Sequence, residues 1–130
     1  QQQKDKPMRY NEYAGDHILR DAFHLYRRNN ITKSQTAFSR RILGMKPSYY
    51  SCMLTRNRQP SRRVLETLLS VTKTIMGTFL GNPHFRQPYA ENLNRAYDQL
   101  EQLVERINVE LNFVDVMAEI ETRPSDALPT

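Results

Sequence analysis

The chain has 130 residues, enough for one domain, and its apolar content of 38% favours a small core. No apolar run approaches the roughly 18 residues of a membrane span, and no basic-then-apolar leader is present, so we expect a soluble, cytoplasmic protein. The formal net charge is +5, but residues 1–65 hold 14 Lys and Arg against 4 Asp and Glu, whereas residues 66–130 hold 5 against 10.

The chain begins with a polar segment that we expect to be flexible. Residues 1–14 start with three glutamines and are broken by a proline, which is typical of a loosely packed arm. Apolar residues at helical spacing then predict a helix over 17–28. Asp16 is the expected cap of this helix, and the pair Asn29 and Asn30 is expected to end it.

Two short helices are predicted next, with a tight turn between them. Thr32 followed by Gln35 has the spacing of a capping box, in which two side chains exchange hydrogen bonds with exposed backbone amides. This helix is expected to stop at Gly44, because glycine tolerates a left-handed C-terminal conformation. Pro47 suits a first helical position, so the following helix is predicted over 47–55.

Ser61 is expected to cap a fourth helix, and glycines and prolines between positions 77 and 88 mark a break after it. We therefore assign residues 15–81 to one helical domain and residues 88–121 to a C-terminal helix. Residues 122–130 are expected to form a flexible tail.

The C-terminal helix carries an apolar stripe with alternating steps of four and three residues. Such a stripe needs a covering surface, and the spacing leaves open whether it forms a homodimer seam or packs back onto the same chain. The residues of this candidate dimerisation seam are Leu93, Tyr97, Leu100, Val104, Ile107, Leu111 and Val114.

The most informative feature is a stretch without acidic residues. Arg27 to Arg63 contains ten Lys and Arg and no Asp or Glu, whereas ordinary solvated surfaces mix both signs. Such a stretch favours a polyanionic partner, most plausibly nucleic acid. Two short helices joined at a glycine within it have the layout of a helix-turn-helix.

The helix-turn-helix assigns a task to each side of the predicted helix 47–55. Tyr50 and Met53 would dock it on the preceding helix, while its small or hydrogen-bonding side chains would face base edges in a major groove. The predicted base-reading residues on that outer face are Ser48, Tyr49, Ser51 and Cys52. The predicted sugar-phosphate contacts around it are Lys46, Thr55, Arg56, Asn57, Arg58, Arg62 and Arg63. Tyr49 could equally fill the core, and Arg40 and Arg41 could equally contact phosphate or solvent.

The segment "ITKSQTAFSRRILGMKPSYYSCMLTRNRQPSRRVLETLL" resembles the DNA-binding helices of the Cro and lambda-repressor-like family, over about Asp16 to Met76. The resemblance implies a bundle of four or five helices whose third helix reads DNA. It implies that Lys46 to Tyr49 enter the groove with Cys52, which adds Pro47 to the base-reading set, and that Gln35 touches phosphate or assists base reading. Lys33, Ser34 and Gln35 complete the predicted set of DNA-backbone contacts. The stretch from Gln35 to Gly44 is one residue longer than the usual family spacing.

The sequence thus predicts an all-α protein: an N-terminal helix-turn-helix bundle of four to five helices, followed by a long amphipathic helix. We expect a sequence-specific, repressor-type transcriptional regulator of bacterial or phage type, located at the nucleoid and bound to double-stranded DNA as a homodimer on a two-fold site. The alternatives are a nucleoid-associated architectural DNA binder and an adaptor that binds a protein through its acidic C-terminal helix. RNA is a lesser possibility.

Other chemistry finds little support in the sequence. No phosphate loop, nucleophile motif or paired carboxylates occur in the basic half, so we do not expect an enzyme or a cofactor. His17, His24 and His84 are scattered, and the single Cys52 forms neither an internal disulfide nor a zinc finger, so no metal site is expected. The cations of the N-terminal arm, Lys4, Lys6 and Arg9, leave open an arm that enters the DNA minor groove.

Overall fold

The computed structural model describes residues 17–122. The predicted arm, the capping role of Asp16 and residues 123–130 of the predicted tail lie outside the described residues. Thr122, which was also assigned to the tail, is the last residue of a helix.

All the regular secondary structure in the described part of the chain is helical, without any strand, which confirms the predicted all-α class. Its elements are α2 (Ile18–Arg28), α3 (Gln35–Ala37), which continues as the π-helical segment η1 (Phe38–Ile42), α4 (Tyr49–Thr55), α5 (Arg62–Leu80) and α6 (Glu91–Thr122). None of these helices is long and apolar enough to cross a membrane.

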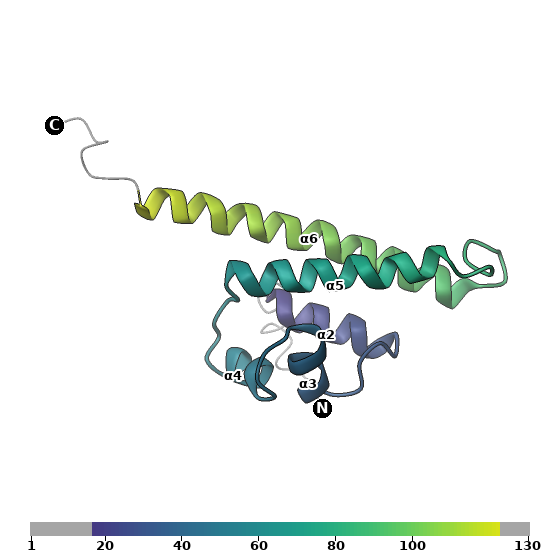
Figure 1. The fold of residues 1–130 in the computed structure, drawn as a ribbon, viewed down its shortest axis with the longest axis horizontal. Coiled ribbons are helices and arrows are strands. Elements are labelled where there is room, and N and C mark those ends of the chain that lie inside the picture. Colours follow the sequence, from purple (N-terminus) through teal and green to yellow (C-terminus); the bar gives the residue numbers. More distant parts are fainter. Residues whose placement is uncertain (1–16, 123–130) are drawn as a thin grey trace, which may run out of the picture.

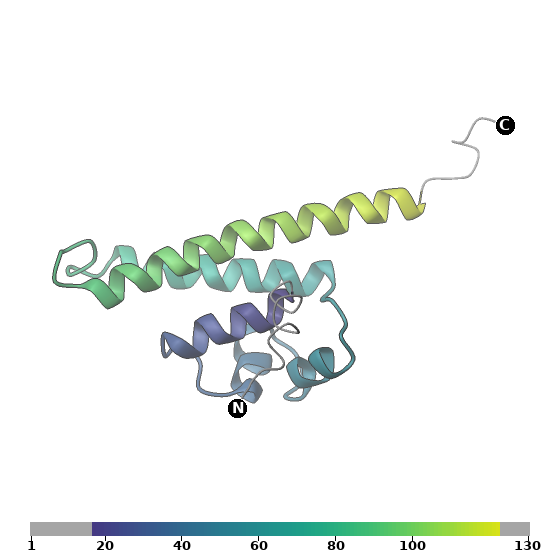
Figure 2. The same ribbon diagram turned by 180° about the vertical axis from the view of Figure 1, so that it is seen from behind.

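The helices form two layers (Figure 1). The long helices α5 and α6 run antiparallel as a hairpin, and α2 lies beside them (Figures 1 and 2). The short elements α3 and α4 lie on the side of the molecule away from α6, and the C-terminal end of α6 extends past the start of α5. The predicted reading helix and the acidic helix therefore occupy opposite sides of the fold.

Four aromatic rings join the short helices to α2. Phe23 and Tyr26 of α2 both contact Phe38 of η1, with ring centroids 5.5 and 5.6 Å apart. Tyr50 of α4 contacts Phe23 and Phe38 at 4.9 and 5.5 Å. Aromatic rings bury much apolar area and add a preferred mutual geometry, so this cluster fixes α4 against the bundle.

The buried hydroxyl of Tyr26 connects the aromatic cluster to α5. It lies 2.6 Å from the Thr72 hydroxyl, and both residues have 0% exposure. Burial raises the pKa of Tyr26 to about 12, although the hydrogen bond with Thr72 acts in the opposite direction. The phenol thus stays neutral and ties α2 to the long hairpin at any physiological pH.

The apolar stripe of α6 packs within the same chain, which decides between the two alternatives that its spacing left open. Leu100 and Ile107 have 0% exposure and join the core formed by α2, α4, η1 and α5. Leu111 and Val114 are half-buried against that core. Leu100 and Ile107 were predicted as dimerisation residues, and this is corrected here: α5 and α2 already cover them, so they cannot contact a second chain in this fold.

Polar contacts also hold α6 on the bundle. The Asn29 side chain at the end of α2 donates to Gln99 Oε1 at 2.9 Å, and Arg106 of α6 forms an ion pair with Asp21 of α2. α6 supplies these polar contacts as well as leucines of the common core. Residues 15–81 and residues 88–121, which we predicted as separate units, therefore share one core.

Helix boundaries follow the sequence signals only in part. The Ser61 hydroxyl accepts a hydrogen bond from the Val64 amide at 3.4 Å, and Gly44 has φ +68°, which confirms both signals. The capping box was wrong, because Thr32 is only 5% exposed and Ser34 caps α3 by accepting from the Ala37 amide at 3.1 Å.

Candidate nucleic-acid interface

The segment before α4 contains a π-helical turn. The Leu43 amide donates to the Phe38 carbonyl oxygen at 3.1 Å, a bond across five residues instead of four. A π turn accommodates one extra residue in a helix without breaking its direction. The stretch from Gln35 to Gly44, which is one residue longer than the spacing of the family that the sequence resembles, thus contains a π turn.

The π segment also supplies the cap of α4. Ser48 is the N-cap residue by position, but its side chain makes no capping hydrogen bond. The hydroxyl of Ser39, which has 0% exposure, instead accepts from the Tyr50 amide at 3.0 Å. A helix leaves its first amides without intrahelical acceptors, so Ser39 satisfies one of them from the neighbouring helix. No sequence signal identified Ser39, because this contact links residues that are not adjacent in the chain.

The two sides of α4 differ in their exposure to solvent. Tyr50 is 1% exposed and Met53 is half-buried against the core. The exposed base-reading candidates are Pro47, Ser48, Ser51 and Cys52, and Thr55 is also exposed. The predicted helix began at Pro47, but α4 begins at Tyr49; Pro47 and Ser48 form the turn before it.

Tyr49 lies between the two alternatives considered for it. It is half-buried and packs against the core, and this burial raises the pKa of its phenol. Its ring therefore supports α4 as well as bordering the exposed face.

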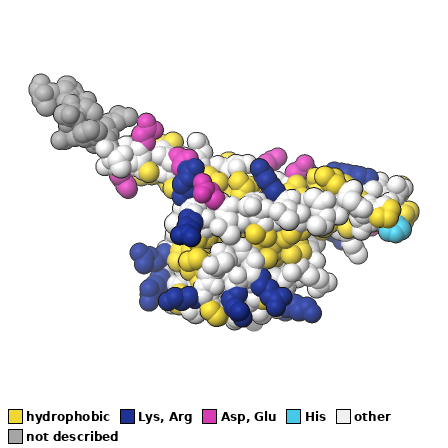
Figure 3. Space-filling model, in the orientation of Figure 1, with side chains coloured by type: hydrophobic (Ala, Val, Ile, Leu, Met, Phe, Trp, Pro, Cys, Tyr) yellow, Lys and Arg dark blue, Asp and Glu magenta, His cyan; other side chains and the backbone are white. Residues whose placement is uncertain are grey.

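Cations surround this face. Figure 3 shows Lys and Arg side chains gathered along the edge of the molecule opposite α6, whereas Asp and Glu lie along α6. The exposed residues of the predicted backbone-contacting set around α4 and before α3 are Lys33, Ser34, Gln35, Lys46, Arg56, Asn57, Arg58 and Arg63. Asn57 has φ +51°, which turns the chain sharply just after α4 and keeps the arginines on either side of it near the helix end.

A shallow groove of about 360 Å³ lies beside α3 and extends the cationic surface. Lys33, Arg40 and Arg41 contribute to its lining, together with the capping residue Ser34. Arg40 and Arg41 are exposed on the π segment, and their position beside Lys33 makes them candidates for phosphate contact that sequence reasoning had left undecided.

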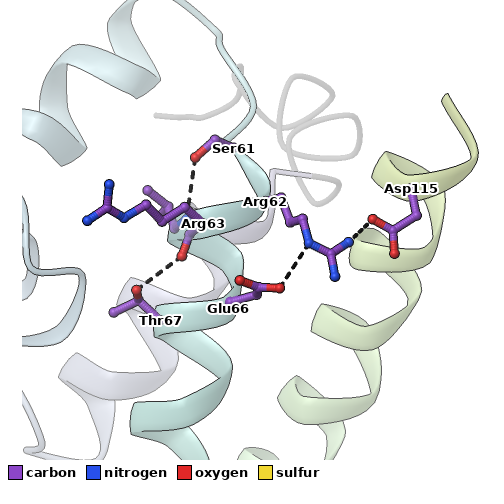
Figure 4. Close-up of polar contacts among 7 residues, drawn as sticks. Ser61, Arg62, Arg63, Glu66, Thr67 and Asp115 are labelled. Carbon is purple, nitrogen blue, oxygen red and sulfur yellow. Dashed lines mark hydrogen bonds and ion pairs between the residues drawn. The ribbon is translucent and has the colours of Figure 1, made fainter. Parts of the chain in front are cut away.

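Arg62 is the member of the predicted set whose environment does not fit a phosphate contact. Its guanidinium points toward α6 and forms ion pairs with Glu66, at 2.9 Å, and with Asp115 (Figure 4). Arg63 points to the other side of α5, away from α6. The assignment of Arg62 is therefore corrected: two carboxylates neutralise it, and it helps to hold α6, while Arg63 remains in the candidate interface.

The loop after α4 is attached to the start of α2. His17 donates from Nε2 to the main-chain carbonyl oxygen of Arg58 at 3.1 Å. Because a carbonyl oxygen can only accept, this contact assigns a proton to Nε2. Burial lowers the pKa of His17, Arg20 acts in the same direction, and the Arg58 contact and Asp21 act in the opposite one. His17 thus has a structural task, whereas His24 and His84 are exposed. Residues 17–122 contain no group of three His, Cys, Asp or Glu placed to hold a metal ion.

The arrangement as a whole defines a small helical protein with a short exposed helix on a cationic face. The chain belongs to a family that is described as a family of unknown function (DUF6626). The family matches residues 19–117, which include all the described helices except the first residue of α2 and the end of α6. Searches of curated proteins and of solved structures gave no match.

Proposed function

We propose that this protein binds double-stranded DNA and regulates transcription, with α4 in the major groove. The observation that carries the proposal is the outer face of α4. It combines exposed Ser48, Ser51 and Cys52 with cations before and after the helix, on the side of the molecule opposite the acidic helix. Small outer side chains let a helix backbone approach base edges, and flanking Lys and Arg neutralise phosphates.

The attachment of α4 supports this role. A reader helix of seven residues has little stability of its own, because isolated short helices are marginal in water. The ring contacts of Tyr50 and the cap from Ser39 hold α4 in one orientation before any ligand arrives. A helix fixed in this way loses little conformational entropy on binding.

An architectural DNA binder is the second candidate, and the composition of α4 favours it. None of the exposed candidates on its outer face is an Arg, Asn or Gln, the side chains that most often form paired hydrogen bonds with bases. Contacts with phosphate would then contribute most of the affinity, and selectivity among sequences would be low.

Selection of bound duplexes from a random-sequence pool separates these candidates. A regulator enriches one motif, and Ser48→Ala changes that motif, whereas Ser70→Ala on the exposed side of α5 does not. If the protein binds duplexes from the pool but enriches no sequence motif, the architectural role is favoured. Failure to retain any duplex at low salt would overturn DNA binding altogether. The symmetry of an enriched motif also tests the predicted homodimer on a two-fold site.

A further inference from the structure

The outer side of α6 carries a second apolar stripe that the fold does not use. Val109, Phe113, Val116 and Ile120 are 67%, 59%, 44% and 55% exposed. At 3.6 residues per turn they lie roughly opposite Ile107 and the other core-facing residues of α6. As far as Val114 the inner side of this segment packs on the core, whereas residues 115–122 are exposed on every side. The outer stripe is therefore left uncovered by the chain along its whole length.

The spacing of the outer stripe is that of a helix seam. Its residues follow one another at steps of four, three and four, which is the repeat by which two helices interlock side chains. Because α6 is already helical as far as Thr122 and is held on the core as far as Val114, pairing through this stripe requires little additional backbone ordering. The surface fits a second helix of the same kind.

We propose that this stripe pairs with the same stripe of a second copy of the chain, with the two α6 helices antiparallel. A parallel pair in register would place Arg106, which precedes Val109 by one step of the repeat, opposite Arg106 of the other copy. It would also place Glu105 beside Glu110 of the other copy. Like charges placed face to face are unfavourable, so the parallel pair is disfavoured.

The antiparallel pair places apolar residues opposite apolar residues. Val109 of one copy then faces Ile120 of the other, and Phe113 faces Val116, which gives four apolar layers related by a two-fold axis. The flanking pairs are Glu110 with Met117 and Asn112 with Glu119. None of these pairs has like charges.

This pairing has a consequence for DNA, which rests on the proposed function. The outer stripe is on the side of α6 turned away from the core. The cationic surface around α4 lies on the side of the molecule opposite α6 (Figure 3). Two copies joined back to back through α6 carry their cationic faces on opposite outer sides. Such a dimer holds two separate duplex segments together. It differs in this from the homodimer predicted from the sequence, which would bind two adjacent half-sites of one straight duplex.

Sedimentation equilibrium of the full chain tests the pairing. We expect a dimer for the unsubstituted protein and at least about tenfold weaker association for Phe113→Glu, because that change places two carboxylates in the seam. Leu80→Glu is the matched control: Leu80 is 64% exposed but lies outside the stripe, so this variant stays dimeric. A protein that is monomeric throughout the micromolar range, or equal association of both variants, would overturn the pairing.

Disulfide trapping in a Cys52→Ser background tests the orientation. A mixture of Val109→Cys and Ile120→Cys copies should form a mixed disulfide dimer. Val109→Cys alone should not, because the two positions 109 lie eleven residues apart along the antiparallel pair, about 16 Å at 1.5 Å per residue and beyond disulfide reach. A disulfide dimer of Val109→Cys alone would show a parallel pair instead.

Capture of a second duplex tests the bridging. An immobilised duplex carrying the protein should retain a labelled second duplex, and Phe113→Glu should bind the first duplex but lose the second. A dimer that binds the first duplex and retains no second one would overturn the bridging. A dimer that binds neither would overturn the proposed function and with it the bridging, whereas the self-pairing would stand on the sedimentation result.

Discussion

The cap that Ser39 provides gives a sharp test of how α4 is held. Ser39→Ala removes the hydroxyl that accepts from the Tyr50 amide at 3.0 Å and changes little else in volume. Ser39 is 0% exposed and Tyr50 1%, so water does not readily replace the lost acceptor. The loss of one partner of a buried hydrogen bond costs about 1–3 kcal/mol, and the loss of a helix cap costs a similar amount.

Urea unfolding followed by circular dichroism measures this loss. We expect the free energy of unfolding of Ser39→Ala to fall by about 1–3 kcal/mol with an unchanged dependence on denaturant. Ser48→Ala is the control, because Ser48 occupies the N-cap position and its side chain makes no capping bond. An equal loss in both variants would refute the assignment of the cap to Ser39.

Three further predictions concern the glycine turn, a buried histidine and an ion pair. Gly44→Ala should lower the free energy of thermal unfolding by about 1–2 kcal/mol, because φ is +68° at this residue. Gly77→Ala within α5 should instead raise it by about 0.5–1 kcal/mol, because an added methyl group meets open space there. The lowered pKa of His17 means that the unfolded chain binds a proton first as pH falls through 6.5, so the unfolding free energy should decrease there. His17→Gln should flatten this dependence. Arg62→Ala should cost at most about 1 kcal/mol, because its partners are half-exposed, and should alter the salt dependence of DNA binding less than removal of an arginine after α4.

Much of the fold could be predicted from local patterns. The apolar spacing in α2, α5 and α6 and the cap at Ser61 each depend on residues within one or two turns, and sequence neighbours determine them. The turn at Gly44 has the same local origin, since only the backbone conformation of that residue matters.

The features that sequence reasoning missed depend on contacts between distant segments. Thr32 has a capping-box pattern, but its position near the core buries it and leaves the cap to Ser34. Arg62 looks like one more cation of the basic stretch until α6 brings Asp115 beside it from 53 positions further along the chain.

The composition of the basic stretch could not reveal its internal geometry. The length of the stretch from Gln35 to Gly44 could be read from the sequence, but the π turn within it is a feature of the folded backbone that its composition does not indicate. Likewise, the apolar stripe of α6 predicted that some surface covers it. Only the fold shows that this surface belongs to the same chain, and which side of α6 stays exposed.

The salt dependence of duplex binding tests the central proposal most directly. For the unsubstituted protein we expect the logarithm of the affinity for a short random-sequence duplex to fall linearly with the logarithm of the salt concentration. The double variant Arg56→Ala with Arg58→Ala should reduce that slope by about 1.8, at about 0.9 for each lost phosphate contact. Arg95→Ala, at the start of α6 and far from α4, should leave the slope unchanged (Figure 1). Equal slopes for all three proteins would contradict a DNA interface at α4.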